Sequence, residues 1–174
     1  MTTLQEYLKN SGVYEDLSKI ISLIADQAGP IRAAFISNQN YADSKNASGE
    51  QQAAMDTWAD SHITRVLAKS GLVRAVASEE QDDITTFSSS AKYSVVMDPL
   101  DGSSLIAVNL CVGTIVGIYD GDVLQPGKNL KAAFNILYGP MTTLTLSVGH
   151  GVAIFAQASD GVYQLLSDTV KMPE

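Results

Sequence analysis

The sequence is short of cysteine, of positive charge and of long apolar runs, and each shortage excludes a class of protein. Its one cysteine, Cys111, cannot form an internal disulfide framework. Its 11 basic residues stand against 19 acidic residues, and the formal net charge of -8 disfavours nucleic acid or an anionic membrane as a partner. No apolar run is long enough to span a bilayer, and the N-terminus lacks the layout of a signal peptide. We therefore expect a cytoplasmic protein.

The length and the composition indicate one folded domain. The chain has 174 residues, of which 45% are hydrophobic and 17% are charged, as is typical of a globular protein with a core of its own. We therefore expect residues 1–174 to form a single domain.

Apolar residues at helical spacing predict two helices in the first part of the chain. In residues 13–36 they recur every three or four positions, and Gly29-Pro30 is expected to kink or interrupt this first helix. Ser48 is expected to open the second helix, with Gln51 as its capping-box partner.

Valine-rich segments and alternation predict strands in the rest of the chain. The segments "LVRAVA" (72–77) and "KYSVVM" (92–97) are short and bounded by turn residues, and residues 106–118 alternate over a longer run. Residues 130–138 are compatible with helix or strand, and a final hairpin turns at 158–161. Because helices come first and strands after, we predict an α+β fold. Two N-terminal helices would pack on a mixed, largely antiparallel sheet of about six strands.

Acidic residues follow each of the two valine-rich segments. Glu79 and Glu80 come after the first segment, and Asp98 and Asp101 come after the second. If the two strands are neighbours that run the same way, these four carboxylates meet at one edge of the sheet. Pro99 keeps Asp98 out of a helical conformation and favours a tight turn. The alternative is that the acids simply end strands and lie in water.

Oxygen ligands without cysteine or histidine suit a hard cation, Mg²⁺ or Mn²⁺. The turn after Asp98 would let the carbonyl of Leu100 join the carboxylates. Gly102, Ser103 and Ser104 follow with small side chains and backbone N–H groups, a combination that forms an anion-binding nest beside a metal. A metal next to a phosphate nest is the chemistry of phosphoryl transfer to water.

Asp56 is a further candidate, in the second predicted helix. Its carboxylate could orient or deprotonate the attacking water near the metal. Asp60 lies one turn further along the same polar face. The alternative is that this face of the helix is simply solvated.

These motifs together resemble a known family. The turn "DPLDGSS" (98–104), with "SEE" (78–80) and "GEQQAAMD" (49–56) before it, resembles class I fructose-1,6-bisphosphatase, of the lithium-sensitive, metal-dependent sugar phosphatase superfamily. The resemblance continues through "VGTIVGIY", "LQPGKNLKAAF" and "YGPMTTL". Inositol monophosphatases differ in that their turn ends in Gly-Thr.

The resemblance implies roles for individual residues. It implies Mg²⁺ or Mn²⁺ as cofactor, held by Glu79, Glu80, Asp98, Asp101 and the Leu100 carbonyl, with Glu50 standing where the family has aspartate. The residues implied to bind the phosphate are Asp101, Gly102, Ser103 and Ser104. Asp56 resembles the carboxylate that prepares the nucleophilic water together with Glu80.

The resemblance also raises the question of regulation by AMP. Lys92 and Tyr93 match a Lys-Tyr pair that contacts the nucleotide in the family, and Ser18 resembles a threonine of the same site. The arginine usual after "GIY" is Asp120 here, which reverses the sign of the contact with phosphate. We therefore expect weak or absent AMP binding. The alternative reading is that Lys92 and Tyr93 merely flank a central strand.

Two departures bear on activity. Leu105 and Ala107 replace polar residues of the family, and the sequence resembles the N-terminal half alone, without the C-terminal sugar-binding domain. One metal-binding glutamate of the family is missing with it, so we expect weak metal binding. The resemblance also implies a homo-oligomer.

Three functions remain open on this basis. The first is Mg²⁺-dependent hydrolysis of fructose 1,6-bisphosphate to fructose 6-phosphate and phosphate, weak or inactive in this chain alone. The second is a non-catalytic relative that keeps the fold for binding or assembly. The third is a phosphatase that acts on sedoheptulose bisphosphate or inositol phosphates.

Overall fold

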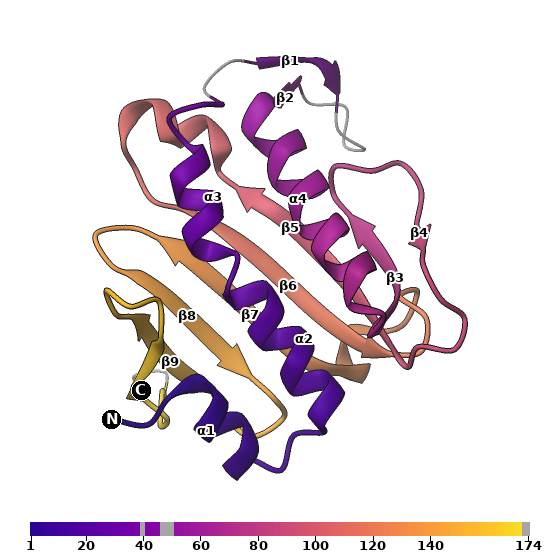
Figure 1. Cartoon of the computed structure of the whole chain (residues 1–174), viewed down its shortest axis with the longest axis vertical. Coiled ribbons are helices and arrows are strands. Elements are labelled where there is room, and N and C mark those ends of the chain that lie inside the picture. The colour runs from indigo at the N-terminus through magenta and orange to yellow at the C-terminus, as the bar shows by residue number, and fades with distance from the viewer. Residues whose placement is uncertain (39–40, 46–50, 172–174) are drawn as a thin grey trace.

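A computed structural model describes residues 1–38, 41–45 and 51–171. Helices form one layer and cover one face of a twisted sheet, which forms the other layer (Figure 1). The α-helices of the described chain are α1 (Leu4–Asn10), α2 (Glu15–Ala25), α3 (Ala28–Ala34) and α4 (Ala54–Ser70). Two short 3-10 helices are η1 (Ser103–Val108) and η2 (Gly127–Asn129). None of the helices in the described chain is long and apolar enough to cross a bilayer.

The main sheet has eight strands in the order β10-β9-β8-β7-β6-β5-β3-β4. They are β3 (Val73–Ser78), β4 (Thr85–Thr86), β5 (Tyr93–Asp101), β6 (Val112–Asp120), β7 (Leu130–Tyr138), β8 (Thr142–Ser147), β9 (Ala153–Gln157) and β10 (Tyr163–Ser167). Strands β1 (Tyr41–Lys45) and β2 (Gln51–Ala53) form a separate antiparallel pair. In the main sheet β3 and β5 are parallel and the other neighbours are antiparallel. The α+β class and the mixed, largely antiparallel sheet are confirmed, but the predicted strand number was too low.

The first predicted helix is two helices, and the break is not where proline suggested. Helix α2 ends at Ala25 and α3 starts at Ala28, so Gly29-Pro30 lies inside the first turn of α3. Proline is tolerated there because the first helical N–H groups have no partner within the helix. Helix α1, capped by a reciprocal pair of hydrogen bonds between Thr3 and Glu6, was not predicted at all. The count of two helices was therefore wrong.

The predicted start of the second helix was also wrong. Helix α4 begins at Ala54, and Gln51 belongs to strand β2 rather than to a capping box. Ser48, the other member of that box, lies outside the described residues. The long alternating run is corrected too, because residues 103–108 form η1 and the strand β6 starts only at Val112.

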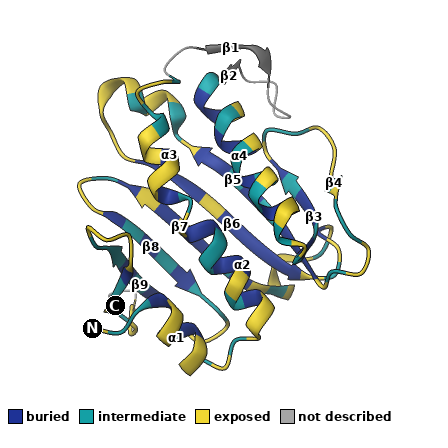
Figure 2. Ribbon diagram, viewed as in Figure 1, coloured by how far each residue is buried: buried dark blue, intermediate teal, exposed yellow. Residues whose placement is uncertain are grey.

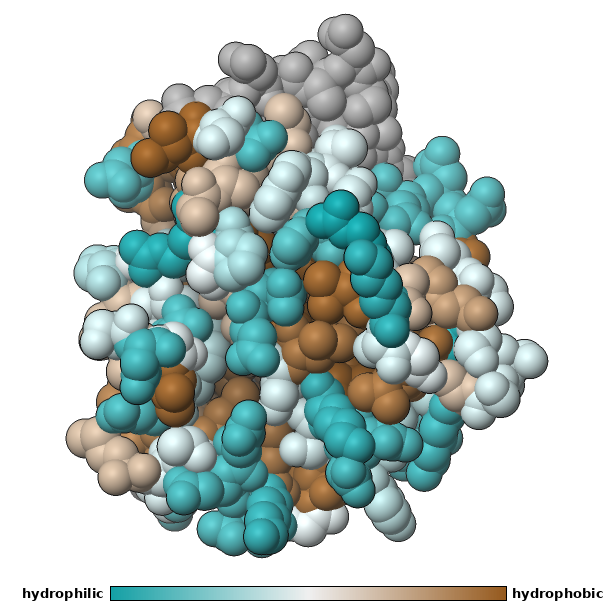
Figure 3. All heavy atoms as spheres, in the orientation of Figure 1, coloured by the Kyte–Doolittle hydropathy of each residue, from teal (hydrophilic) through white to brown (hydrophobic). Residues whose placement is uncertain are grey.

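The hydrophobic core lies between the helices and the sheet. Helix α2 contributes Ile20 and Ile21 and α4 contributes Ile63, all with no exposed surface, and they pack toward buried residues such as Val95 and Leu144 of the sheet. Each such side chain contributes about 1.5–3 kcal/mol when fully buried. Figure 2 shows the buried residues on the inner sides of α2 and α4 and along the central strands. From outside, hydrophilic side chains surround an apolar area near the centre of the helical face (Figure 3).

Candidate functional site

The two acid-bearing segments leave the sheet side by side. Strands β3 and β5 are parallel neighbours, which is the condition under which the sequence predicted that their acids meet, and Ser78 lies opposite Met97. The N–H of Glu79 donates to the carbonyl of Met97 at 3.0 Å, which continues the pairing past the end of β3. The carboxyl ends of both strands therefore bring Glu79 next to Asp98.

The carboxyl group of Asp98 interacts with that of Glu79. Partial burial, the hydrogen bond to Glu79 and the charges of Glu79 and Asp101 raise the pKa of Asp98 to about 7. The N–H of Leu100 donates to Asp98 Oδ1 at 3.0 Å and acts in the opposite direction. Asp98 therefore takes up a proton more readily than an ordinary carboxyl group, and a cation bound beside it would relieve the same repulsion.

A bulge in β5 shapes the turn after Asp98. Asp98 pairs with Ile115 and Asp101 with Gly113, so three steps on β5 oppose two on β6. Thr114 Oγ1 donates to the carbonyl of Pro99 at 2.9 Å and fixes the bulge from the buried side. The bulge re-aims the residues that follow Asp98.

The turn then reverses at Gly102, whose φ of 78° lies in the left-handed region that favours glycine. Its carbonyl accepts from the N–H of Leu105 at 2.8 Å, and η1 begins at Ser103. Ser103 Oγ donates to Asp56 Oδ2 at 2.9 Å. Ser104, the next residue, is exposed. The turn is therefore tied to the first turn of α4.

Asp56 and Asp60 are both buried, so the interpretation of their helix face as a solvated face was wrong. Asp56 is 6% exposed and Asp60 is 7% exposed. Asp60 Oδ2 accepts from Gln81 Nε2 at 2.7 Å. Neither Asp60 nor Gln81 was predicted to belong to the site, and the signal that could have found them is the helical spacing of two acids on α4.

The predicted ligands come together only in part. Asp98 lies beside Glu79 and within electrostatic reach of Asp101, and the N–H of Glu80 donates to Ser78 Oγ at 3.3 Å. In the described part of the chain no cluster of three or more aspartate, glutamate, histidine or cysteine side chains is arranged to hold a metal ion. Glu50 lies outside the described residues. The donors present are oxygens only, which fits a hard cation better than zinc.

Two of the residues predicted for nucleotide binding, Lys92 and Tyr93, lie at the other end of β5, where the strand begins. Lys92 Nζ lies 3.3 Å from Asp120 Oδ2 and 4.8 Å from the centre of the Tyr14 ring, just before α2. The hydrogen bond to Asp120 raises the pKa of Lys92. Tyr93 is 2% exposed and belongs to the core, and Ser18 lies in α2, where its N–H donates to the carbonyl of Tyr14. Lys92 is thus already paired with an acid.

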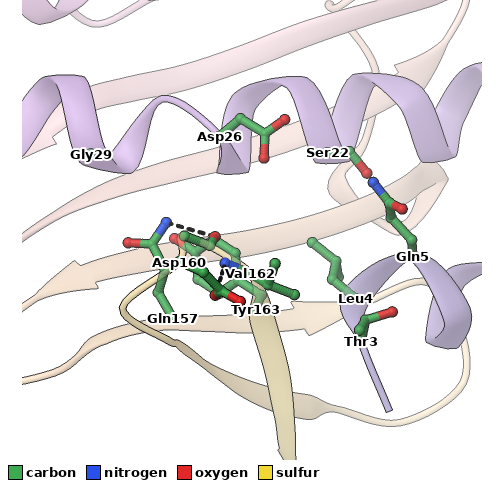
Figure 4. Close-up of a pocket in the computed structure, with 11 residues that line it drawn as sticks. Thr3, Leu4, Gln5, Ser22, Asp26, Gly29, Gln157, Asp160, Val162 and Tyr163 are labelled. Atoms are coloured by element: carbon green, nitrogen blue, oxygen red, sulfur yellow. Dashed lines mark hydrogen bonds between the residues drawn. The ribbon is translucent and has the colours of Figure 1, made fainter. Parts of the chain in front are cut away.

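A separate cavity of about 510 Å³ lies between α1, α2 and the β9–β10 hairpin (Figure 4). Asp26 and Tyr163 are among its lining residues. None of the acids that follow β3 and β5 lines it, so it is distinct from the site described above.

Comparison with known proteins covers nearly the whole chain. Residues 6–168 match the model of the N-terminal domain of fructose-1,6-bisphosphatase. The class 1 fructose-1,6-bisphosphatase of Methanocorpusculum labreanum is 71% identical over 174 residues, which are 100% of this chain and 54% of that protein. The corresponding protein of Methanospirillum hungatei is 55% identical over 177 residues, which are 100% of this chain and 57% of that protein. The chain thus spans about half the length of these relatives.

Solved structures show the same fold. The holo fructose-1,6-bisphosphatase of Leishmania major superposes with a TM-score of 0.87 at 27% identity, over 94% of this chain and 57% of that chain. A putative sedoheptulose-1,7 bisphosphatase from Toxoplasma gondii superposes with a TM-score of 0.86 at 26% identity, over 99% of this chain and 60% of that chain.

Proposed function

Since the chain belongs to the class 1 fructose-1,6-bisphosphatase family, a family of phosphomonoesterases, we propose that its acids form part of a Mg²⁺-dependent site that removes phosphate from a sugar bisphosphate. Fructose 1,6-bisphosphate is the first candidate substrate. The observation that supports the proposal best is the interaction of Glu79, directly after β3, with Asp98, near the end of the parallel strand β5. Such a pair is costly without a cation or a proton between the carboxylates.

The cation would be held by acids and one backbone oxygen. Its ligands in this proposal are Glu79, Glu80, Asp98, Asp101 and the carbonyl of Leu100. When bound, Mg²⁺ neutralises phosphate oxygens and lowers the pKa of a coordinated water. Mn²⁺ accepts the same oxygen ligands and serves as the experimental substitute.

The chain's own residues would orient the substrate and move the proton. The N–H groups of Gly102, Ser103 and Ser104 would bind the oxygens of the phosphate that is removed. Asp56, buried and fixed by Ser103, would accept the proton of the attacking water together with Glu80. Burial keeps Asp56 in one orientation, which is what a general base requires.

We further propose that this 174-residue chain turns over sugar bisphosphate slowly. It spans 54% of a relative that is 71% identical to it, and nothing in its sequence resembles a pocket for the sugar and the distal phosphate. Loss of substrate positioning alone can remove several powers of ten in rate.

A second candidate, a relative that retains the fold for binding or assembly, is favoured by one observation. Leu105 and Ala107 are exposed apolar residues in η1, directly after the phosphate turn. A sedoheptulose bisphosphatase is the third candidate, because the fold similarity includes a protein with that putative activity. A homo-oligomer and a cytoplasmic location remain expectations.

Phosphate release tests these candidates directly. The purified chain is incubated with Mg²⁺ and either fructose 1,6-bisphosphate or sedoheptulose 1,7-bisphosphate, beside the Asp101→Ala variant. Slow release that Asp101→Ala abolishes supports the phosphatase, and the ratio between the two sugars identifies the preferred substrate. Release that the variant leaves unchanged would contradict the assignment.

A further inference from the structure

Helix α4 contacts both acid-bearing segments through two carboxylates one turn apart. Asp56 Oδ2 accepts from Ser103 of the turn after β5, at 2.9 Å. Asp60 Oδ2 accepts from Gln81 of the turn after β3, at 2.7 Å. Residues four apart on a helix lie on the same face, so the helix sets the distance between these two contacts.

Both ends of the Gln81 amide are used. Its Nε2 donates to Asp60, and its Oε1 accepts from Thr85 Oγ1 at 2.6 Å. A flipped amide would place Oε1 against the carboxylate of Asp60, which repels it. Asp60 therefore selects one orientation of Gln81.

Gln81 directly follows the two predicted metal ligands. Its N–H donates to the carbonyl of Ser78 at 3.2 Å, and the N–H of Glu80 donates to Ser78 Oγ at 3.3 Å, so residues 78–81 form a closed turn. The Gln81 side chain joins this turn to α4. Asp60 is 7% exposed, so water competes little for the contact.

We propose that Asp60 is a positioning residue for the metal site. Through Gln81 it fixes the Glu79–Glu80 turn against α4, at a set distance from Asp56. The effect on metal binding rests on the proposed function, because it requires Glu79 and Glu80 to be ligands. The fixed turn itself does not depend on that function. Partners that orient metal ligands typically change metal affinity about 10- to 100-fold when removed.

A double-mutant cycle on the 174-residue chain tests the link. Asp60→Ala, Gln81→Ala and the double variant are titrated with Mn²⁺ alone, followed by electron paramagnetic resonance, with thermal unfolding measured in parallel. We expect each single variant to weaken Mn²⁺ binding about tenfold, and the double variant to be no weaker than either one, because both remove the same link. Asp60→Asn, which keeps an acceptor, should restore part of the affinity. Ser61→Ala, at the exposed next position of α4, is the control and should bind as the wild type does.

Hydrogen exchange without metal separates this proposal from the metal site. Faster exchange at the amides of Glu80 and Gln81 in both single variants is expected. Wild-type Mn²⁺ affinity in Asp60→Ala and Gln81→Ala would overturn the proposal. A wild-type chain that binds no Mn²⁺ would instead contradict the proposed metal site. Hydrogen exchange at Glu80 and Gln81 that is the same in the variants as in the wild type would overturn the positioning role as well. If Asp60→Ala does not fold, Gln81→Ala, at a half-buried position, decides the matter.

Discussion

Glu79 directly follows strand β3 and Asp98 lies near the end of the parallel neighbouring strand β5, so that their carboxyl groups interact. The arrangement follows from the direction of the strands, because parallel strands place their carboxyl ends at the same edge of a sheet. Two neighbouring carboxylates repel each other unless one is protonated or a cation lies between them. The raised pKa of Asp98 is the direct expression of this repulsion together with partial burial.

Metal binding should therefore compete with the proton on Asp98. Because burial and Glu79 raise the pKa of Asp98 to about 7, we expect Mn²⁺ affinity to increase about tenfold between roughly pH 6 and pH 8. Calorimetric titration at several pH values measures this increase. Asp98→Asn should bind Mn²⁺ much more weakly, whereas Asp82→Asn, an exposed position in the same acidic segment, should not differ from wild type. Identical titrations for all three proteins would contradict the metal site.

The same carboxyl group should make stability depend on pH in the absence of metal. Its pKa is higher in the folded protein, about 7, than in the unfolded chain, about 4. The folded state then binds more protons between those values, so the free energy of unfolding is greatest below about pH 4 and falls as the pH rises toward 7. Because Asp98 is only partly buried and solvent screens it, we expect a loss on the order of 1 kcal/mol.

Urea denaturation at pH 5 and pH 7.5 measures this loss. Asp98→Asn cannot ionise, so the difference in unfolding free energy between the two pH values should be smaller in that variant. A variant with the same difference as wild type would show that other groups cause it.

Binding of AMP should be weak because Lys92 is already paired with Asp120. The ammonium group lies 3.3 Å from Asp120, whose charge would repel a phosphate at this position. We expect Asp120→Arg to strengthen AMP binding about tenfold, which is about 1.4 kcal/mol. Equilibrium dialysis with labelled AMP measures it, with Asp122→Arg as a control for added charge nearby. Micromolar binding by the wild type that Lys92→Ala removes would contradict this prediction.

Much of the sheet could be predicted because its signal is local. The valine-rich segments that became β3 and β5, and the hairpin of β9 and β10, are short runs bounded by turn residues. The strand number could not be predicted, since β4 has only two residues and β7 has a composition that also suits a helix. Pairing with β6 and β8 decided the conformation of β7, and such pairing is set by tertiary structure.

Other elements were mistaken because a local pattern had two interpretations. Residues 106–111 alternate as a strand does, but Gly102 and Asn109, with φ of 78° and 57°, enclose a 3-10 helix there. Proline at position 30 suggested an interruption, yet the first turn of a helix accepts it. In both cases the local sequence pattern did not show where a helix begins or ends.

The acids around Glu79 and Asp98 were found from the sequence because they follow two recognisable strands. Asp60 was not found, because a pair of acids four residues apart is also typical of an exposed helix face. Asp60 is buried, and its Oδ2 accepts a hydrogen bond from Gln81, 21 residues later in the chain. Contacts of that kind appear only once the helix is placed against the sheet.

The hydrogen bond between Ser103 and Asp56 should stabilise the fold, and two adjacent serines provide a matched test. Ser103 Oγ donates to the buried Asp56 carboxylate, whereas Ser104 is an exposed residue with the same side chain in the same turn. Removing one partner of a buried hydrogen bond costs about 1–3 kcal/mol. We expect Ser103→Ala to lower the free energy of unfolding by about 1–2 kcal/mol and Ser104→Ala to lower it by less than about 0.5 kcal/mol. Urea denaturation at neutral pH measures both.

Because Asp56 would also be less firmly oriented, phosphate release by Ser103→Ala should fall even at temperatures where the variant is fully folded. Equal stability of the two variants would show that this bond does not fix the turn to α4.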